Sequence, residues 1–174
     1  ASYLDPEGIF RAFELRKGTR IADVGTGTGF FALPAGRIVG PEGRVYAVDL
    51  SPEMLEDLQS KLGREPRSNV EAIRSTEDRI PLSDASVDFA FLACVLHELD
   101  GPGTLLECRR ILVPTGRLGV VDWKKEEMEF GPPKAHRLDL DQARAILGDA
   151  GFRPTRTFEA GRYHYGIEAR IRRG

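Results

Sequence analysis

The sequence predicts an α/β fold in which helices cover both faces of a mostly parallel sheet. Short apolar segments alternate along the chain with amphipathic segments of helical period, the pattern of strand–helix–strand units. Residues 87–95 form a nearly continuous apolar run, as expected of a central strand buried on both faces. Near the end of the chain, polar and apolar residues alternate on either side of Ala160-Gly161, which predicts an antiparallel hairpin. The seven expected strands are residues 20–24, 44–48, 70–73, 87–95, 118–123, 152–158 and 163–171.

Proline residues mark the first two helices. Asp5 at an N-cap, followed by Pro6 at the first helical position, predicts a leading helix within residues 1–18. The helix after the first strand contains Pro34, which is tolerated in a first turn but bends a helix interior. This helix is therefore expected either to start late, near Phe31, or to be kinked.

Three further helices are predicted from their end signals. A Ser-Pro pair at residues 51–52 caps the third helix, and a Gly-Pro-Gly run at 101–103 begins the fourth. The fourth helix is expected to end at Pro114, which opens a turn into the next strand. Asp139 and Gln142 resemble a capping box, with Asp in the Ser/Thr role, at the start of the fifth. The residues expected to share one face of the third helix are Met54, Leu55, Leu58 and Leu62.

Composition and charge limit the class of protein. At 174 residues the chain fits a single domain, 1–174, by the usual range of about 100–200 residues per domain. A net charge of −2, with 30% charged and 41% hydrophobic residues, argues against disorder and against a nucleic-acid-binding surface. No apolar run approaches the roughly 20 residues of a membrane span and no signal peptide is recognised, so a cytoplasmic protein is expected. Cys94 and Cys108 are too few for a disulfide framework or a cysteine metal cluster, and no metal site is expected.

A glycine-rich turn follows the first strand and carries the main functional signal. Asp23 is followed by Gly25, Gly27 and Gly29 at every second position, and glycine lets a chain bend sharply and approach a ligand closely. A strand that runs into such a turn and then a helix is the usual opening of a nucleotide-binding unit. A dinucleotide fingerprint would require its third glycine at the position of Phe30. The carboxylate of Asp23 would repel a pyrophosphate but attract a ligand that bears an ammonium or sulfonium group.

The D-x-G-x-G-x-G pattern of residues 23–29 resembles motif I of the class I S-adenosylmethionine (SAM)-dependent methyltransferases. Asp49 closes the second strand, and the segment Leu-Ser-Pro-Glu-Met-Leu follows it, as in this family. The V-D-W-K stretch at 121–124 is similar to the small-molecule branch that includes the quinone-biosynthesis and arsenite methyltransferases. The resemblance implies a seven-stranded Rossmann-like sheet, mostly parallel, with helices on both faces and an antiparallel C-terminal strand. Three further landmarks occur in the family's order, at residues 80–89, 96–99 and 109–118.

The resemblance also implies which residues bind SAM or its product S-adenosylhomocysteine (SAH). Asp23 would face the amino group of the cofactor; the alternative is a carboxylate satisfied by the N–H groups of its own loop. Asp49 would accept hydrogen bonds from both ribose hydroxyls, and its alternative role is a negative charge at the start of the following helix. Backbone carbonyl groups at Ala93 and Cys94 would face the ammonium group. The implied cofactor-binding residues are Asp23, Gly25, Thr26, Gly27, Gly29, Asp49, Leu50, Met54, Thr76, Glu77 and Ala93.

The adenine end of the cofactor leaves two alternatives open. Leu50 and Met54 would flank the ring, although plain core packing is nearly as good an explanation of Met54. The acid with which the family commonly reads the adenine amino group falls on Thr76 in this chain. Either the hydroxyl of Thr76 or the carboxylate of Glu77 is therefore expected to take that role.

His97 is the candidate catalytic residue because it follows the fourth strand, where the reaction centre is expected. An unperturbed histidine pKa of about 6.5 suits proton removal, although a histidine that only fixes its loop explains the pattern equally well. Asp122 and Trp123, at the end of the fifth strand, are candidates for the acceptor pocket. His136 lies in a polar loop, 124–138, that is a candidate lid over the pocket.

Together these observations predict transfer of a methyl group from SAM to a small-molecule acceptor, by displacement in line with the S–CH₃ bond. No covalent enzyme intermediate is needed for this reaction, so the lack of a nucleophile motif is no objection. The alternatives are a non-catalytic SAM-binding module and, less favoured, an NAD-dependent oxidoreductase. Arsenite is disfavoured as the acceptor because that chemistry uses several cysteine thiolates and the chain has two cysteines. The expected partner is a small molecule and not a nucleic acid, and the resemblance is compatible with a homodimer.

Overall fold

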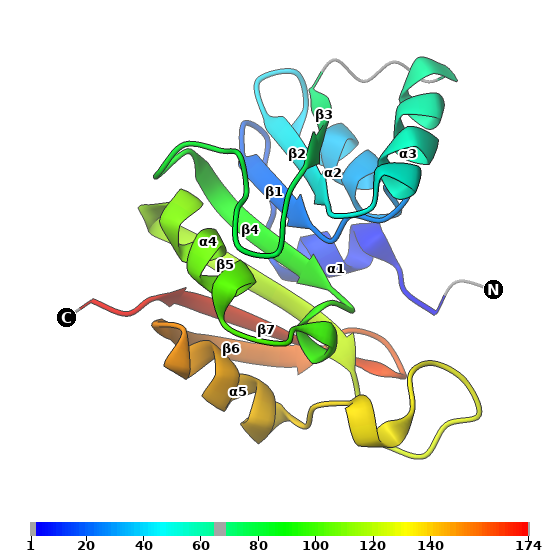
Figure 1. Cartoon of the computed structure of the whole chain (residues 1–174), viewed down its shortest axis with the longest axis vertical. Helices are drawn as coiled ribbons and strands as arrows, with labels where there is room; N and C mark the ends of the chain where they lie inside the picture. Colours follow the sequence, from blue (N-terminus) through cyan, green and yellow to red (C-terminus); the bar gives the residue numbers. More distant parts are fainter. Residues whose placement is uncertain (1–2, 65–68, 174) are drawn as a thin grey trace.

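The computed structural model of the chain describes residues 3–64 and 69–173. These residues form one seven-stranded sheet in the order β3-β2-β1-β4-β5-β7-β6. Strands β1 to β5 are parallel neighbours, whereas β7 runs antiparallel to both β5 and β6 (Figure 1). The predicted fold class, with its antiparallel C-terminal hairpin, is confirmed. The strands are β1 (Arg20–Val24), β2 (Arg44–Asp49), β3 (Val70–Arg74), β4 (Val87–Ala93), β5 (Leu112–Trp123), β6 (Phe152–Glu159) and β7 (His164–Ile171).

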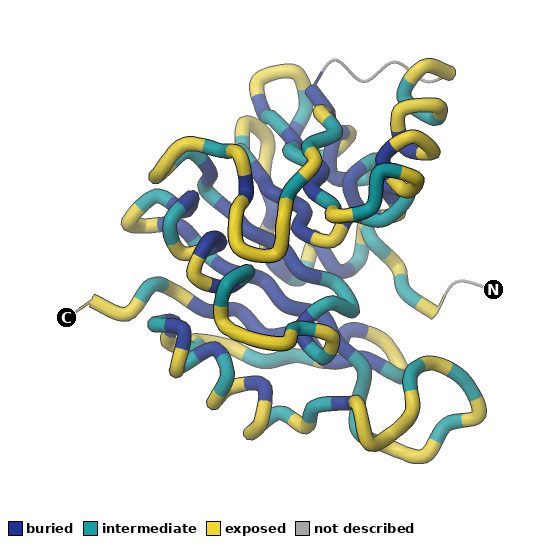
Figure 2. Tube along the Cα trace, in the orientation of Figure 1, coloured by how far each residue is buried: buried dark blue, intermediate teal, exposed yellow. Residues whose placement is uncertain are grey.

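Helices cover both faces of this sheet, as predicted (Figure 1). Strand β4 shows why, because its side chains alternate between two separate hydrophobic clusters. Phe89 and Phe91 belong to one cluster, and Ala90 and Leu92 belong to the other. Figure 2 shows these central strands as the buried interior of the molecule. Helices α1 (Pro6–Ala12), α2 (Ala32–Val39) and α3 (Pro52–Arg64) contribute to the Phe89 cluster, and α4 (Gly103–Ile111) and α5 (Leu140–Asp149) to the Ala90 cluster.

The helix ends follow the capping signals closely. Helix α2 begins at Ala32, which places Pro34 in its first turn, so the late start is confirmed and no kink is needed. Asp139 and Gln142 form a complete capping box at the start of α5, also as predicted. Asp5 occupies the N-cap position of α1, but its side chain makes no capping hydrogen bond to a described residue. Within the described ranges, no helix is both long enough and apolar enough to cross a membrane.

The segment around Pro114 differs from the prediction. Helix α4 ends at Ile111, and β5 begins at once with Leu112, which pairs with Val87 of β4. The register then jumps to Phe89 paired with Arg117, so a bulge, and not a separate turn, absorbs residues 113–116. Leu112 is buried, and its packing starts the strand before the proline. The prediction that Pro114 ends the helix and opens a turn was wrong for this reason.

Two smaller expectations also need correction. Strand β4 ends at Ala93 and not at residue 95, because Cys94 adopts a left-handed backbone conformation with φ of 57°. Met54 does not share the buried face of α3 with Leu55 and Leu58, since it is 44% exposed. Core packing therefore does not explain Met54.

Candidate functional site

A cleft lies at the carboxyl edge of the parallel strands, where the strand order reverses. The chain progresses outward from β1 to β2 and β3 on one side, and from β1 to β4 and β5 on the other. Ligands of open α/β sheets bind at this switch point, because the loops after adjacent strands diverge there. The cleft has a volume of about 270 Å³ and is lined by residues that follow β1, β2, β3 and β4. The predicted cofactor-binding residues that line it are Gly25, Asp49, Leu50, Thr76, Glu77 and Ala93.

The glycine bend forms the floor of the cleft at Gly25. Its φ is 76°, a left-handed conformation, and a Cβ atom there would collide with the side chain of Val95, which also lines the cleft. Gly29 has a different role, because a Cβ atom on it would lie 2.5 Å from Leu58 of α3. The first glycine therefore keeps the cleft open, and the last allows α3 to pack closely against the bend.

The amide groups of the bend donate hydrogen bonds within the protein. The N–H groups of Gly25 and Thr26 donate to the carbonyl of Val48, at 2.8 and 2.9 Å. The N–H group of Gly27 donates to Oδ2 of Asp49 at 2.7 Å. The bend is thus held in shape by its neighbours, and what it offers a ligand is close approach of the backbone.

Asp23 lies behind this bend and is buried, with 2% of its surface exposed. Its Oδ2 accepts a hydrogen bond of 2.7 Å from the hydroxyl of Thr26, so a side chain of the loop, and not the loop's N–H groups, satisfies it. Burial raises the pKa of Asp23 to about 7, the Thr26 bond opposes this shift, and the negative charge of Asp49 adds to it. A positive charge nearby would therefore favour the ionised form of Asp23 strongly.

Asp49 links the bend to the start of α3. Its Oδ1 accepts from the N–H of Ser51 at 2.9 Å, and its Oδ2 accepts from the N–H of Gly27. A carboxylate has about four acceptor positions, so two of them remain for a ligand in the cleft. Leu50, beside it, is 47% exposed and lines the cleft, so it offers apolar surface to a ligand bound there. Met54 is exposed as well but does not belong to the described lining of the cleft.

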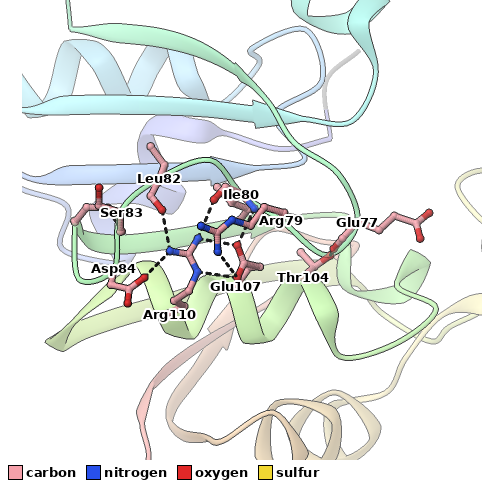
Figure 3. A network of polar contacts seen from close by, with 10 residues as sticks. Glu77, Arg79, Ile80, Leu82, Ser83, Asp84, Thr104, Glu107 and Arg110 are labelled. Carbon is pink, nitrogen blue, oxygen red and sulfur yellow. Dashed lines mark hydrogen bonds and ion pairs between the residues drawn. The ribbon is translucent and has the colours of Figure 1, made fainter.

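The segment after β3 forms a second wall. Thr76 and Glu77 are both exposed and both line the cleft, so the two alternatives for the adenine contact stay open. Ile80, which sequence reasoning missed as a site residue, also lines it. This segment is held by a network of side chains from α4 (Figure 3).

The segment after β4 forms the wall that faces the bend. Ala93 and Cys94 line the cleft as predicted, and the N–H of Cys94 donates to Val121 at 2.8 Å. Burial raises the pKa of the Cys94 thiol to about 12, which favours a neutral packing residue over a nucleophile. Val95 and Leu99, missed in the sequence, lie in the same wall. Both residues lie shortly after the end of β4, and the loops that follow parallel strands meet at the carboxyl edge of the sheet, so their place in the sequence was a usable signal.

His97 and Asp122, for which the sequence predicts separate roles, form a buried pair. Nδ1 of His97 lies 2.7 Å from Oδ1 of Asp122, and Oδ2 of Asp122 accepts from the backbone N–H of His97 at 3.0 Å. The two side chains are 5% and 1% exposed. Because a carboxylate only accepts, Nδ1 carries the proton and Nε2 is the basic nitrogen. Burial lowers the pKa of His97, but its hydrogen bond to Asp122 and the charge of Asp122 outweigh this, so that the pKa is raised.

The loop 124–138 is ordered by Arg137, a buried residue that sequence reasoning missed. Its guanidinium donates to the backbone carbonyl groups of four loop residues and lies over the ring of Trp123, 5.8 Å from its centroid. His136 sits on an exposed 3₁₀ turn, η2 (Lys134–His136), of the same loop. The four carbonyl groups that accept from Arg137 belong to Lys124, Glu126, Phe130 and Pro132.

The described cleft lining includes none of the candidate acceptor residues Asp122, Trp123 and His136.

His164 of β7 packs against Trp123, with ring centroids 4.1 Å apart. It is fully buried, and neither ring nitrogen has a hydrogen-bond partner among the described residues. Burial lowers its pKa to about 4, so the ring is neutral at ordinary pH. In the part of the chain that the structure describes, no group of three or more His, Cys, Asp or Glu side chains could hold a metal ion.

A family model, a solved structure and two curated relatives place the chain in one family. The family described as "Methyltransferase domain" matches residues 22–120. A SAM-dependent methyltransferase from Aquifex aeolicus has a crystal structure with a TM-score of 0.93 and 39% identity, covering 97% of this chain and 90% of that chain. The arsenite methyltransferase of Halobacterium salinarum is 27% identical over 146 residues, or 78% of this chain. The demethylmenaquinone methyltransferase of Geobacillus kaustophilus is 32% identical over 111 residues, or 63% of this chain. The chain spans 37% and 47% of the lengths of these two curated relatives.

Proposed function

Because this chain belongs to the family of SAM-dependent methyltransferases, we propose that it transfers a methyl group from SAM to a small-molecule acceptor by in-line displacement. The observation that carries the proposal is the cleft at the switch in strand order. Gly25, the half-buried carboxylate of Asp49 and the exposed Leu50 meet in that cleft. A nucleoside with a positively charged sulfur matches this combination of close backbone approach, acceptor oxygens and apolar surface.

The residues of the cleft, together with Asp23 behind the bend, would fit the cofactor in three respects. Asp49 would hold the ribose hydroxyls through its two remaining acceptor positions. Leu50 would cover one side of the adenine ring, with Thr76 or Glu77 at its edge. Asp23, whose ionised form burial disfavours, would gain stability from the ammonium group near it. When bound, SAM supplies a methyl group activated by its sulfonium sulfur.

His97 is the residue of this chain that would accept a proton from the acceptor. Asp122 fixes its orientation and leaves Nε2 as the basic nitrogen. The acceptor would approach between the segment after β4 and the loop 124–138, with Trp123 and His136 as candidate contacts. Arsenite is not favoured as the acceptor. Burial raises the pKa values of Cys94 and Cys108 to about 12, so neither thiol is a ready thiolate.

Calorimetric titration with SAH and with NADH tests the cofactor. We expect micromolar binding of SAH and none of NADH, and the reverse result would discard the proposal. Mass spectrometry of a cell extract incubated with the protein and methyl-labelled SAM then tests transfer. A labelled product that disappears with Asp49→Ala supports the enzyme, whereas binding of SAH without any labelled product favours a non-catalytic module.

Three further properties belong to this proposal. A single domain over residues 1–174 predicts one cooperative unfolding transition by calorimetry. A homodimer is compatible with the resemblance to the family, and sedimentation at micromolar concentration tests it. A cytoplasmic location is expected, and fractionation of cells that express the natural gene product would test it.

A further inference from the structure

Two side chains of α4, Glu107 and Arg110, hold the segment after β3 through hydrogen bonds and ion pairs (Figure 3). The guanidinium of Arg110 donates to the carbonyl groups of Ile80 and Leu82, both at 2.8 Å, and to the carboxylate of Asp84 at 2.7 Å. The carboxylate of Glu107 accepts from the N–H of Ile80 at 2.8 Å. The backbone of Ile80 is therefore bonded through both its N–H and its C=O to this pair.

The pair is itself a preorganised unit. Nε and Nη2 of Arg110 each donate to one oxygen of Glu107, both at 2.7 Å, which is a bidentate contact. The residues stand three positions apart and so lie one above the other on α4. Their side chains are only 20% and 11% exposed, so solvent competes weakly with these bonds.

The segment that the pair holds is the segment that lines the cleft. Ile80 contributes to the lining directly, together with Thr76 and Glu77. Thr76 is bridged to Arg79, next to Ile80, by a hydrogen bond of 3.0 Å between its N–H and the carbonyl of Arg79. A third residue of α4, Thr104, donates its hydroxyl to the carbonyl of Glu77 at 3.3 Å. Both ends of this wall are thus hydrogen-bonded to side chains of α4, although the carboxylate of Glu107 does not itself line the cleft.

We propose that Glu107 and Arg110 are positioning residues that set the wall of the cleft beside the adenine ring of the cofactor. This inference rests on the proposed function, since it assumes that the cleft binds SAM and SAH. Without the pair, the N–H of Ile80 and the carbonyl of Leu82 lose these partners, and the carbonyl of Ile80 keeps only the N–H of Leu82, so the wall relaxes toward solvent. Neither residue lies in the described lining of the cleft, so the effect on binding would be indirect.

Calorimetric titration of SAH into Arg110→Ala, well below its unfolding temperature, tests the proposal. We expect the dissociation constant to rise about tenfold while the number of binding sites stays at one per chain. A residue that served folding alone would lower the number of competent sites and leave the dissociation constant unchanged. Arg110→Lys, which keeps the charge but loses the planar fork, should give a smaller rise and covers the case in which the alanine variant does not fold. Glu107→Gln provides the same test from the other partner.

The matched control is Arg20→Ala. Arg20 forms a bidentate pair with Asp88, at 2.8 and 3.1 Å, but these residues lie at the amino ends of β1 and β4, away from the cleft. We expect this variant to lose stability without a change in SAH affinity. Unchanged affinity in Arg110→Ala, Arg110→Lys and Glu107→Gln, with normal binding by the wild type, would overturn the inference. Failure of the wild type to bind SAH would instead overturn the proposed function.

Discussion

Asp23 is a buried carboxylate whose burial should cost the protein stability at neutral pH. Its pKa is about 7 in the folded chain, against 3.8 for an ordinary Asp. Between pH 3.8 and pH 7, the folded state therefore keeps a proton on Asp23 that the unfolded state has lost. Stability falls as pH rises through this window and is constant above it. Asp23→Asn removes the titration but keeps an oxygen that can accept from the hydroxyl of Thr26.

The size of the effect follows from the pKa difference. At about 1.4 kcal/mol per pKa unit, the raised pKa of Asp23 lowers the unfolding free energy by about 4 kcal/mol at pH 8 and by about 1.7 kcal/mol at pH 5, relative to a pH below both pKa values. The amide of the variant has its own cost of desolvation, but that cost does not change with pH. Relative to the wild type, Asp23→Asn should therefore gain about 2–3 kcal/mol of unfolding free energy between pH 5 and pH 8.

Urea unfolding of both proteins at pH 5 and pH 8, without ligand, measures this difference. Asp141→Asn is the control, because the side chain of Asp141 is 95% exposed and its substitution should give the same change at both pH values. The reasoning is refuted if the difference between wild type and Asp23→Asn is independent of pH, or if the variant loses stability relative to the wild type as pH rises.

The other predictions concern the cleft and the loop beside it. Affinity for SAM should fall as pH drops below about 7, because protonated Asp23 offers no negative charge to the ammonium group; titration at pH 6 and pH 8 measures it, and affinity independent of pH contradicts it. His97→Ala should lower turnover of the labelled product while SAH affinity stays within a few-fold, and an unchanged rate would exclude His97 as a base. Arg137→Ala should lower the unfolding free energy in urea by about 2–4 kcal/mol, since four carbonyl groups lose a buried donor; Arg137→Lys should not restore it, and full stability of either variant would refute this role.

Elements with local signals were predictable from the sequence. The late start of α2 follows from Pro34, and the capping box of α5 follows from Asp139 and Gln142, because these effects act within one helical turn. The prediction at Pro114 failed because a contact between distant residues outweighed the local signal. A proline usually ends a helix and opens a turn, but here the pairing of Leu112 with Val87 starts the strand before the proline, which lies in a bulge.

The features of the candidate site likewise include some that have a local sequence pattern and others that do not. Gly25 and Asp49 were identified because the bend and the strand end are contiguous patterns, and the cleft brings them together. The contact between His97 and Asp122 joins residues 25 positions apart, and only the adjacency of β4 and β5 creates it. Arg137 gave no pattern to recognise, since its partners are backbone carbonyl groups of its own loop.

A crystal structure of the chain with SAH tests the account most directly. We predict density for the nucleoside in the cleft above Gly25, with both ribose hydroxyls on the carboxylate of Asp49 and the adenine beside Leu50. Density at another place on the molecule, or an Asp49 side chain that points away from the sugar, would contradict it.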